Sequence, residues 1–103
     1  MNKRVTGGRL EVELKGGTLY TLDATDFGGN IHTVTITNLG TKTLILGINE
    51  TTDSMNAKYS DDKGYPLAGG QSVSFGDTEY PGIGVVHLIC GDATGTEANV
   101  GWF

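Results

Sequence analysis

The feature that most constrains the fold of this chain is a series of short segments in which apolar and polar residues alternate. In the first segment Leu10, Val12 and Leu14 are separated by Glu11 and Glu13. A period of two places the apolar side chains on one face of a β-strand, whereas a helix needs a period near 3.6 residues. No segment of even ten residues has the helical period, so the pattern predicts an all-β chain.

Turn signals separate these segments at short intervals. The 17 glycines supply tight turns, and the 14 threonines suit half-exposed strand surfaces. The expected strands cover residues 9–14, 19–23, 31–38, 43–48, 72–75, 85–90 and 98–103. Seven or eight short antiparallel strands, with a turn after each, are typical of a β-sandwich or a jelly roll.

Two expected strands lie close together in the sequence. Residues 31–38 and 43–48 flank the turn signal Asn38-Leu39-Gly40-Thr41, and we expect them to form a β-hairpin. Residues 43–48 and 85–90 are almost continuously apolar, which predicts central strands covered on both faces. The polar residues from Asp26 to Asn30 are expected to form a turn.

The length and the charge of the chain indicate one acidic domain with a basic N-terminal segment. A chain of 103 residues is expected to form a single domain over residues 1–103, with residues 1–8 as an N-terminal arm. Lys3, Arg4 and Arg9 give the first nine residues a charge of +3, and the net charge of −5 leaves −8 for the rest. The arm is either ordinary solvated charge or a segment that docks on an acidic neighbour. The negative net charge disfavours nucleic acid as a partner.

The chain has few residues that could form a catalytic or metal-binding site. Cys90 is the sole cysteine and lies in an apolar strand, where a thiol packs as a small hydrophobic group. His32 and His87 have no metal-ligand spacing, and Cys90 and His87 leave opposite faces of one strand. We therefore expect no catalytic site, no bound metal and no cofactor. No apolar stretch is long enough to span a bilayer and no signal-peptide pattern opens the chain, so no membrane partner is expected.

Aromatic residues remain as candidates for contact with other proteins. Phe27, Tyr59, Tyr65 and Tyr80 stand near glycine or proline, and residues 49–64 form a long polar stretch with no apolar period. These rings either cap the ends of the sandwich or contact a partner, since tyrosine is favoured at interfaces. Trp102 and Phe103, at the end of the last strand, are expected to be shielded from water either in the core or in an interface. The candidate interface residues are Lys3, Arg4, Tyr59, Tyr65, Tyr80, Trp102 and Phe103.

Several segments follow one another in a recognisable order. A strand that ends in a turn precedes an apolar strand, a Gly-Tyr-Pro-Leu segment, a Tyr-Pro-Gly segment, a strand that ends in Cys, and a closing strand with an aromatic end. These segments are Val34–Asn38, Thr43–Gly47, Gly64–Gly70, Tyr80–Gly82, Val85–Cys90 and Thr96–Trp102. In this order, residues 31–103 resemble the small structural proteins of bacteriophage virions, which include capsid decoration (cement) and head-fibre proteins.

The resemblance implies a non-enzymatic β-sandwich that is part of the virion. It would be made in the host cytoplasm, bind the major capsid protein on the outer capsid surface, stabilise the head, and form a homotrimer. Two alternatives remain open. One is a tail or fibre accessory protein, and the other is a carbohydrate-binding β-sandwich whose aromatic loops stack on sugars.

Overall fold

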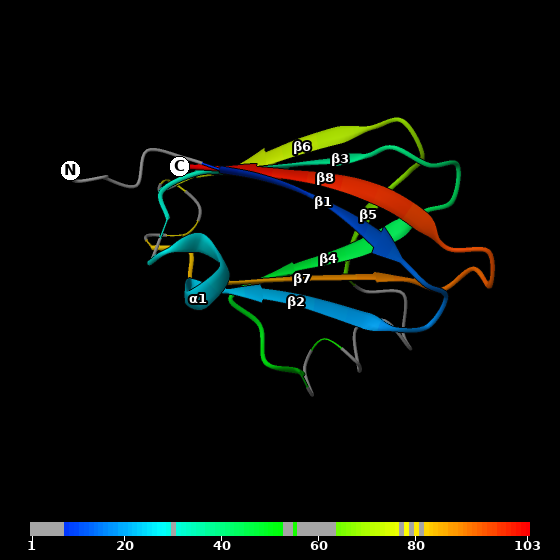
Figure 1. The fold of residues 1–103 in the computed structure, drawn as a ribbon, viewed down its shortest axis with the longest axis horizontal. Coiled ribbons are helices and arrows are strands. Elements are labelled where there is room, and N and C mark those ends of the chain that lie inside the picture. The colour runs from blue at the N-terminus through cyan, green and yellow to red at the C-terminus, as the bar shows by residue number, and fades with distance from the viewer. Residues whose placement is uncertain are drawn as a thin grey trace.

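The computed structural model describes residues 8–29, 31–52, 55, 64–76, 78, 80 and 82–103. Eight strands form two four-stranded antiparallel sheets that face each other (Figure 1), and the prediction of an all-β sandwich is confirmed. The strands are β1 (Gly8–Leu14), β2 (Leu19–Asp23), β3 (Val34–Asn38), β4 (Leu44–Ile48), β5 (Tyr65–Leu67), β6 (Ser72–Phe75), β7 (Val85–Cys90) and β8 (Thr96–Trp102). One helical turn, α1 (Ala24–Phe27), follows β2.

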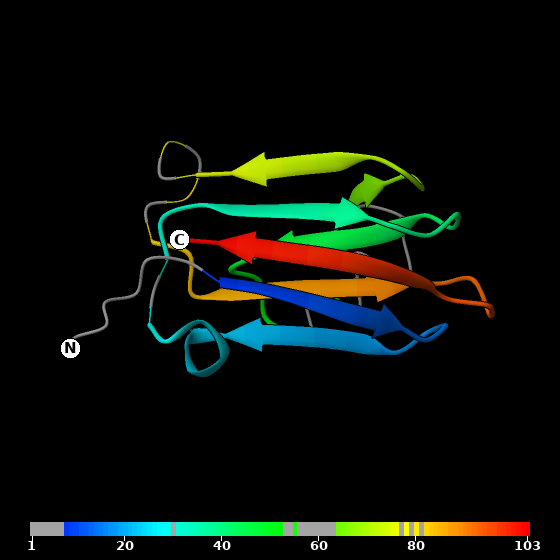
Figure 2. The ribbon, with the colours of Figure 1, turned by 45° about the horizontal axis from the view of Figure 1, so that its top comes forward.

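The strand order is that of a jelly roll. One sheet has the order β1-β8-β3-β6 and the other has the order β2-β7-β4-β5, so β1 lies over β2 and β6 lies over β5 (Figure 2). The connections β1–β2, β3–β4, β5–β6 and β7–β8 each pass from one sheet to the other. Two interlocked sheets of this kind expose only four edge strands, namely β1, β2, β5 and β6.

The expected hairpin of residues 31–38 and 43–48 is wrong. β3 pairs with β6 and β8, whereas β4 pairs with β5 and β7 in the opposite sheet. The turn between them is short enough for a hairpin, but it carries the chain across the sandwich instead. Alternation of apolar residues specifies which face of a strand is buried and does not specify the neighbouring strand.

Three local features also differ from the sequence prediction. The expected turn at residues 26–30 begins as the helical turn α1, and β3 starts at Val34 rather than at residue 31. Residues 65–67 form β5, a strand that the sequence did not predict because it contains Pro66. Proline lacks the N–H that a central strand needs, but β5 lies at the edge of its sheet, where this donor is dispensable.

The main core lies between the two sheets and is formed by the inward-facing residues of the strands. A second, smaller cluster of Ile45, Met55 and Ile89 covers the outer face of β4 and β7. All five residues of β4 are therefore buried, which confirms the expectation of a central strand covered on both faces. Gly47 makes room for this layer, since a Cβ at this position would collide with the Sδ atom of Met55.

Asn38, at the end of β3, is a fully buried polar residue that connects the two sheets. Its Nδ2 donates hydrogen bonds to the carbonyl oxygens of Lys42, at 2.7 Å, and of Leu67 in β5, at 2.9 Å. Its Oδ1 accepts hydrogen bonds from the amide of Gly40, at 3.1 Å, and from the Thr96 hydroxyl in β8, at 2.7 Å. Every hydrogen-bonding atom of the amide group is thus used, as burial of a polar group requires.

We expect Asn38→Ala to lower the free energy of unfolding by about 2–4 kcal/mol, because it leaves several buried donors and acceptors without partners. Asn38→Asp should also destabilise the protein, since a carboxylate cannot donate to the two carbonyl oxygens. Urea denaturation followed by tryptophan fluorescence measures both effects. Asn99→Ala, on the outer face of β8, is the matched control and should cost less than about 0.5 kcal/mol. Equal effects at the two positions would contradict the assigned role of Asn38.

Candidate functional site

Three aromatic rings close one open edge of the sandwich. Tyr65 begins β5 and Phe75 ends β6, and these are the outermost strands of the two sheets on the same side of the molecule (Figure 2). The rings of Tyr65 and Phe75 are 5.5 Å apart between centroids, and those of Phe75 and Tyr80 are 5.8 Å apart. Both pairs meet edge to face, the arrangement that aromatic quadrupoles favour. We call Tyr65, Phe75 and Tyr80 the aromatic edge.

A pocket of about 130 Å³ opens at the aromatic edge. All three rings line it, together with Glu50, Gly64 and residues of β4. Phe75 is nearly buried and Tyr80 is half-buried, whereas Tyr65 keeps 46% of its surface exposed. The pocket therefore combines an accessible ring with a firmly packed one.

Glu50 is positioned by hydrogen bonds of its neighbours. Asn49, which has a positive φ of 57°, donates from its side chain to the Gly82 carbonyl at 3.0 Å and accepts from the amide of Gly84 at 2.9 Å. The main-chain oxygen of Glu50 lies 2.8 Å from Nε2 of His87. These contacts fix the backbone on both sides of the pocket residue. The sequence pattern did not single out Asn49 as a structural residue, although asparagine is enriched at positive φ.

His87 is a buried histidine, 2% exposed, and both of its ring nitrogens have hydrogen-bond partners. Because a carbonyl oxygen can only accept, the proton lies on Nε2, which donates to Glu50, and Nδ1 accepts from the Thr21 hydroxyl at 3.0 Å. Cys90 is buried on the opposite, core side of β7. The two side chains are thus separated by the sheet, and they form no nucleophile–base pair.

The C-terminal aromatic residues lie at the end of the sandwich where β8 finishes. Trp102 is half-buried between Gly8 of β1 and Val34 of β3, and its ring meets that of Phe27 at 5.0 Å. A Cβ at position 8 would approach the indole to 2.6 Å, so glycine is required there. The main chain of Phe103 bonds to Thr33, but 59% of this residue is exposed.

Two of the aromatic residues, Phe75 and Trp102, lie on the inner side of the same sheet. Val34 pairs with Trp102 on one side and with Phe75 on the other, so the two rings extend from strands that flank β3. We call the aromatic edge together with Trp102 and Phe103 the aromatic end. Strands β6 and β8 finish at the end of the sandwich opposite the β1–β2, β3–β4 and β7–β8 turns (Figure 1).

Of the residues that the sequence suggested for an interface, Tyr65 and Tyr80 lie together around Phe75, and Trp102 and Phe103 lie at the end of β8, on the other side of β3. The other three, Lys3, Arg4 and Tyr59, lie outside the described residues. For Phe27 the capping alternative holds, because its ring is buried against that of Trp102. Phe75, the last residue of β6, completes the aromatic edge.

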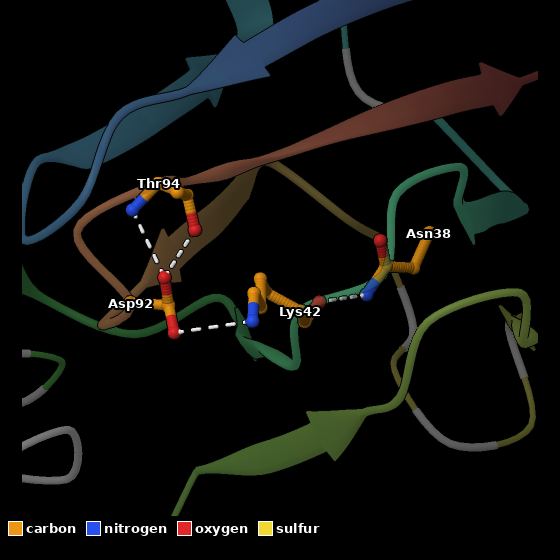
Figure 3. Close-up of polar contacts among 4 residues, drawn as sticks. All are labelled: Asn38, Lys42, Asp92 and Thr94. Carbon is orange, nitrogen blue, oxygen red and sulfur yellow. Dashed lines mark hydrogen bonds and ion pairs between the residues drawn. The ribbon is translucent and has the colours of Figure 1, made fainter.

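The opposite end of the sandwich carries a polar contact between two turns (Figure 3). The Asp92 carboxylate accepts hydrogen bonds from the hydroxyl and the amide of Thr94, and it lies 3.7 Å from Nζ of Lys42. The bonds from Thr94, and secondarily the charge of Lys42, hold the pKa of Asp92 below its ordinary value of 3.8. The contact joins the β7–β8 turn to the β3–β4 turn, where Asn38 binds the Lys42 carbonyl.

In the part of the chain that the structure describes, no three His, Cys, Asp or Glu residues lie together as metal ligands would. None of the helices among the same residues is long and apolar enough to cross a membrane.

No protein-family model and no curated protein matches the chain. Among solved structures, it is similar to the solution NMR structure of a de novo designed double-stranded β-helix. The TM-score is 0.50 at 14% sequence identity, and the match covers 94% of this chain and 97% of the designed one. At this identity the likeness concerns the fold alone. It agrees with the arrangement of eight strands in two antiparallel sheets described above.

Because the folded state lowers the pKa of Asp92, ionised Asp92 stabilises the fold above its ordinary pKa, and this contribution is lost as the pH falls through the lower folded value. We expect Asp92→Asn to lower the urea midpoint slightly at neutral pH. The difference from the wild type should shrink between neutral pH and about pH 2, as Asp92 of the wild type takes up a proton and becomes neutral like asparagine. Glu11→Gln, an exposed substitution on β1, serves as control. A deficit that is the same at both pH values would refute the electrostatic assignment.

Proposed function

We propose that this protein is a non-enzymatic structural component of a bacteriophage virion, namely a decoration or cement protein that binds the outer surface of the capsid. Support comes from the sequence resemblance of residues 31–103 and from a jelly-roll body without a cluster of metal-ligating side chains among its described residues. The proposed partners are the major capsid protein and further copies of the chain in a homotrimer.

The observation that carries the proposal is the aromatic end. Tyr65 and Phe103 are 46% and 59% exposed, and half-buried Tyr80 and Trp102 lie beside them. Interfaces are enriched in tyrosine, tryptophan and phenylalanine, and a few such residues supply most of the binding energy. Partly exposed rings on a rigid sandwich suit docking without rearrangement, which keeps the entropic cost of binding low.

The arrangement of the termini adds a second line of support. Gly8 begins β1 directly beside Trp102, so the chain segment that carries Lys3 and Arg4 joins the sandwich at the aromatic end. A neighbouring acidic surface could contact the aromatic end and the basic segment together.

A carbohydrate-binding module is the second candidate, and the pocket beside Tyr65, Tyr80 and Glu50 is the observation in its favour. Aromatic faces and a carboxylate are groups that can hold a sugar. A glycan array separates the two candidates, because a decoration protein should be silent on it. A tail or fibre location is separated from a head location by electron microscopy of particles labelled with an antibody.

We expect the purified protein to co-sediment with undecorated capsid shells at micromolar concentration. The double variant Tyr65→Ser/Phe103→Ser should bind at least about 10-fold more weakly, since truncating aromatic anchors removes a large share of binding energy. Leu39→Ser is the matched control, because Leu39 is 50% exposed at the opposite end of the sandwich. Absence of co-sedimentation, or equal binding by the double variant, would contradict the proposal.

A further inference from the structure

We infer that strand β1 pairs edge to edge with β1 of a second copy of this chain, across a two-fold axis. The two copies would then share one continuous sheet in which each β1 runs antiparallel to the other. This contact is independent of the proposed function, and it can be tested on the purified protein without capsids. Three features of β1 carry the inference: its free edge, the apolar side chains beside it and the order of its charges.

Strand β1 is the longest and most regular of the edge strands. It pairs with β8 along all seven of its residues in one unbroken register, so it contains no bulge. Among the described residues, no strand pairs with its other edge. The remaining edge strands are shorter, since β2 has five residues, β6 has four, and β5 has three with a proline among them. A long edge strand without bulge or proline is a ready template for a further strand.

Two apolar side chains are incompletely covered where β1 lies over β2 (Figure 2). Leu10 of β1 lies opposite buried Val100, and Tyr20 of β2 lies opposite buried Leu88, so both face the core. Both are nevertheless only half-buried, because the sandwich ends beside them. A second copy placed against β1 would cover Leu10 and would continue its apolar layer with Val12 of that copy, and such burial favours association.

The charges along β1 are complementary to one another when the strand pairs with itself. The outward side chains are those of Arg9, Glu11 and Glu13, and Lys15 follows the strand at 3.7 Å from Glu13. If all seven residues pair antiparallel with the same seven of the second copy, Arg9 of each copy lies opposite Glu13 of the other. The two Glu11 side chains then face each other on the axis, and each has Arg9 of the other copy on its diagonal. A shift that brings Lys15 opposite Arg9 would place like charges together throughout.

The other charges oppose association only at long range. Glu97 of β8 lies opposite Glu13 on the outer face, and each copy has a net charge of −5, a sum that already includes Lys3 and Arg4. Two copies therefore repel each other at a distance. At about 0.15 M salt this repulsion is screened beyond about 8 Å, whereas paired side chains of adjacent strands lie only about 5 Å apart.

Charge reversal tests the contact, with self-association of the full chain measured by sedimentation velocity at about 0.15 M salt. Arg9→Glu and Glu13→Arg should each weaken association at least about 5-fold, because each places like charges opposite each other twice. The double variant Arg9→Glu/Glu13→Arg restores both pairs at unchanged net charge and should associate like the wild type. Within one copy the two residues are roughly 13 Å apart along the strand, so this rescue must act between copies. Gln71→Glu, in the β5–β6 turn, adds a negative charge away from β1 and should have no effect.

Cysteine cross-linking tests the register. Two copies of Glu11→Cys would face each other across the axis within reach of a disulfide, whereas two copies of Arg9→Cys would lie roughly 13 Å apart. Mild oxidation should therefore cross-link Glu11→Cys into a dimer at least about 10-fold faster than Arg9→Cys. A mixture of Arg9→Cys and Glu13→Cys should give the mixed dimer. Cys90 is buried and is left in place.

Three outcomes would overturn the inference: single reversals that leave association unchanged, a double variant that fails to recover it, or equal cross-linking of Glu11→Cys and Arg9→Cys. Backbone NMR spectra of each variant confirm that it is folded. A wild-type protein that stays monomeric at millimolar concentration would also refute the pairing. A trimer whose mass and cross-linking ignore all of these substitutions would refute the β1 contact and leave the proposed homotrimer standing.

Discussion

The two sheets depend on one buried amide for their alignment at the turn end of the sandwich. Asn38 is the last residue of β3, and its side chain forms hydrogen bonds with the β3–β4 turn, with β5 and with β8. A single side chain therefore links the two sheets and the turn between them. The Asp92 contact with Lys42 extends this network to the β7–β8 turn. The turn end is thus ordered by polar groups, whereas the aromatic rings of Phe27, Phe75, Tyr80 and Trp102 pack in or against the core and only Tyr65 and Phe103 are exposed.

Most of the strands could be predicted from the sequence, because successive side chains of a strand point to opposite faces and apolar residues therefore alternate with polar ones. The residues of β2, β6 and β7 were predicted with their bounds, and the near-continuous apolar runs identified β4 and β7 as central strands. Strand pairing was not accessible, since a short turn serves a hairpin and a sheet crossing equally well. β5 was missed because proline disfavours strands in general, and only its edge position makes Pro66 acceptable.

The candidate site was predictable by residue type but not by arrangement. Tyrosines beside glycine and proline suggested contact residues, and Tyr65 and Tyr80 do share one edge of the sandwich. The ring that joins them, Phe75, lies in an alternating strand and carries no signal apart from its core role. Glu50 belongs to a polar stretch without a period, and only the hydrogen bonds of Asn49 and His87 define its place.

The pairing of β1 with β8 has a mechanical consequence. These strands hold the beginning and the end of the described chain side by side, with Gly8 opposite Trp102. Strand β1 lies at a sheet edge and pairs with β8 along its whole length, so its detachment would have to begin at one of its two ends, and the Gly8–Trp102 pair is one of them. A neighbour seated on Trp102 and Phe103 would block detachment from that end, so attachment would lengthen the lifetime of the folded domain as well as fix its position.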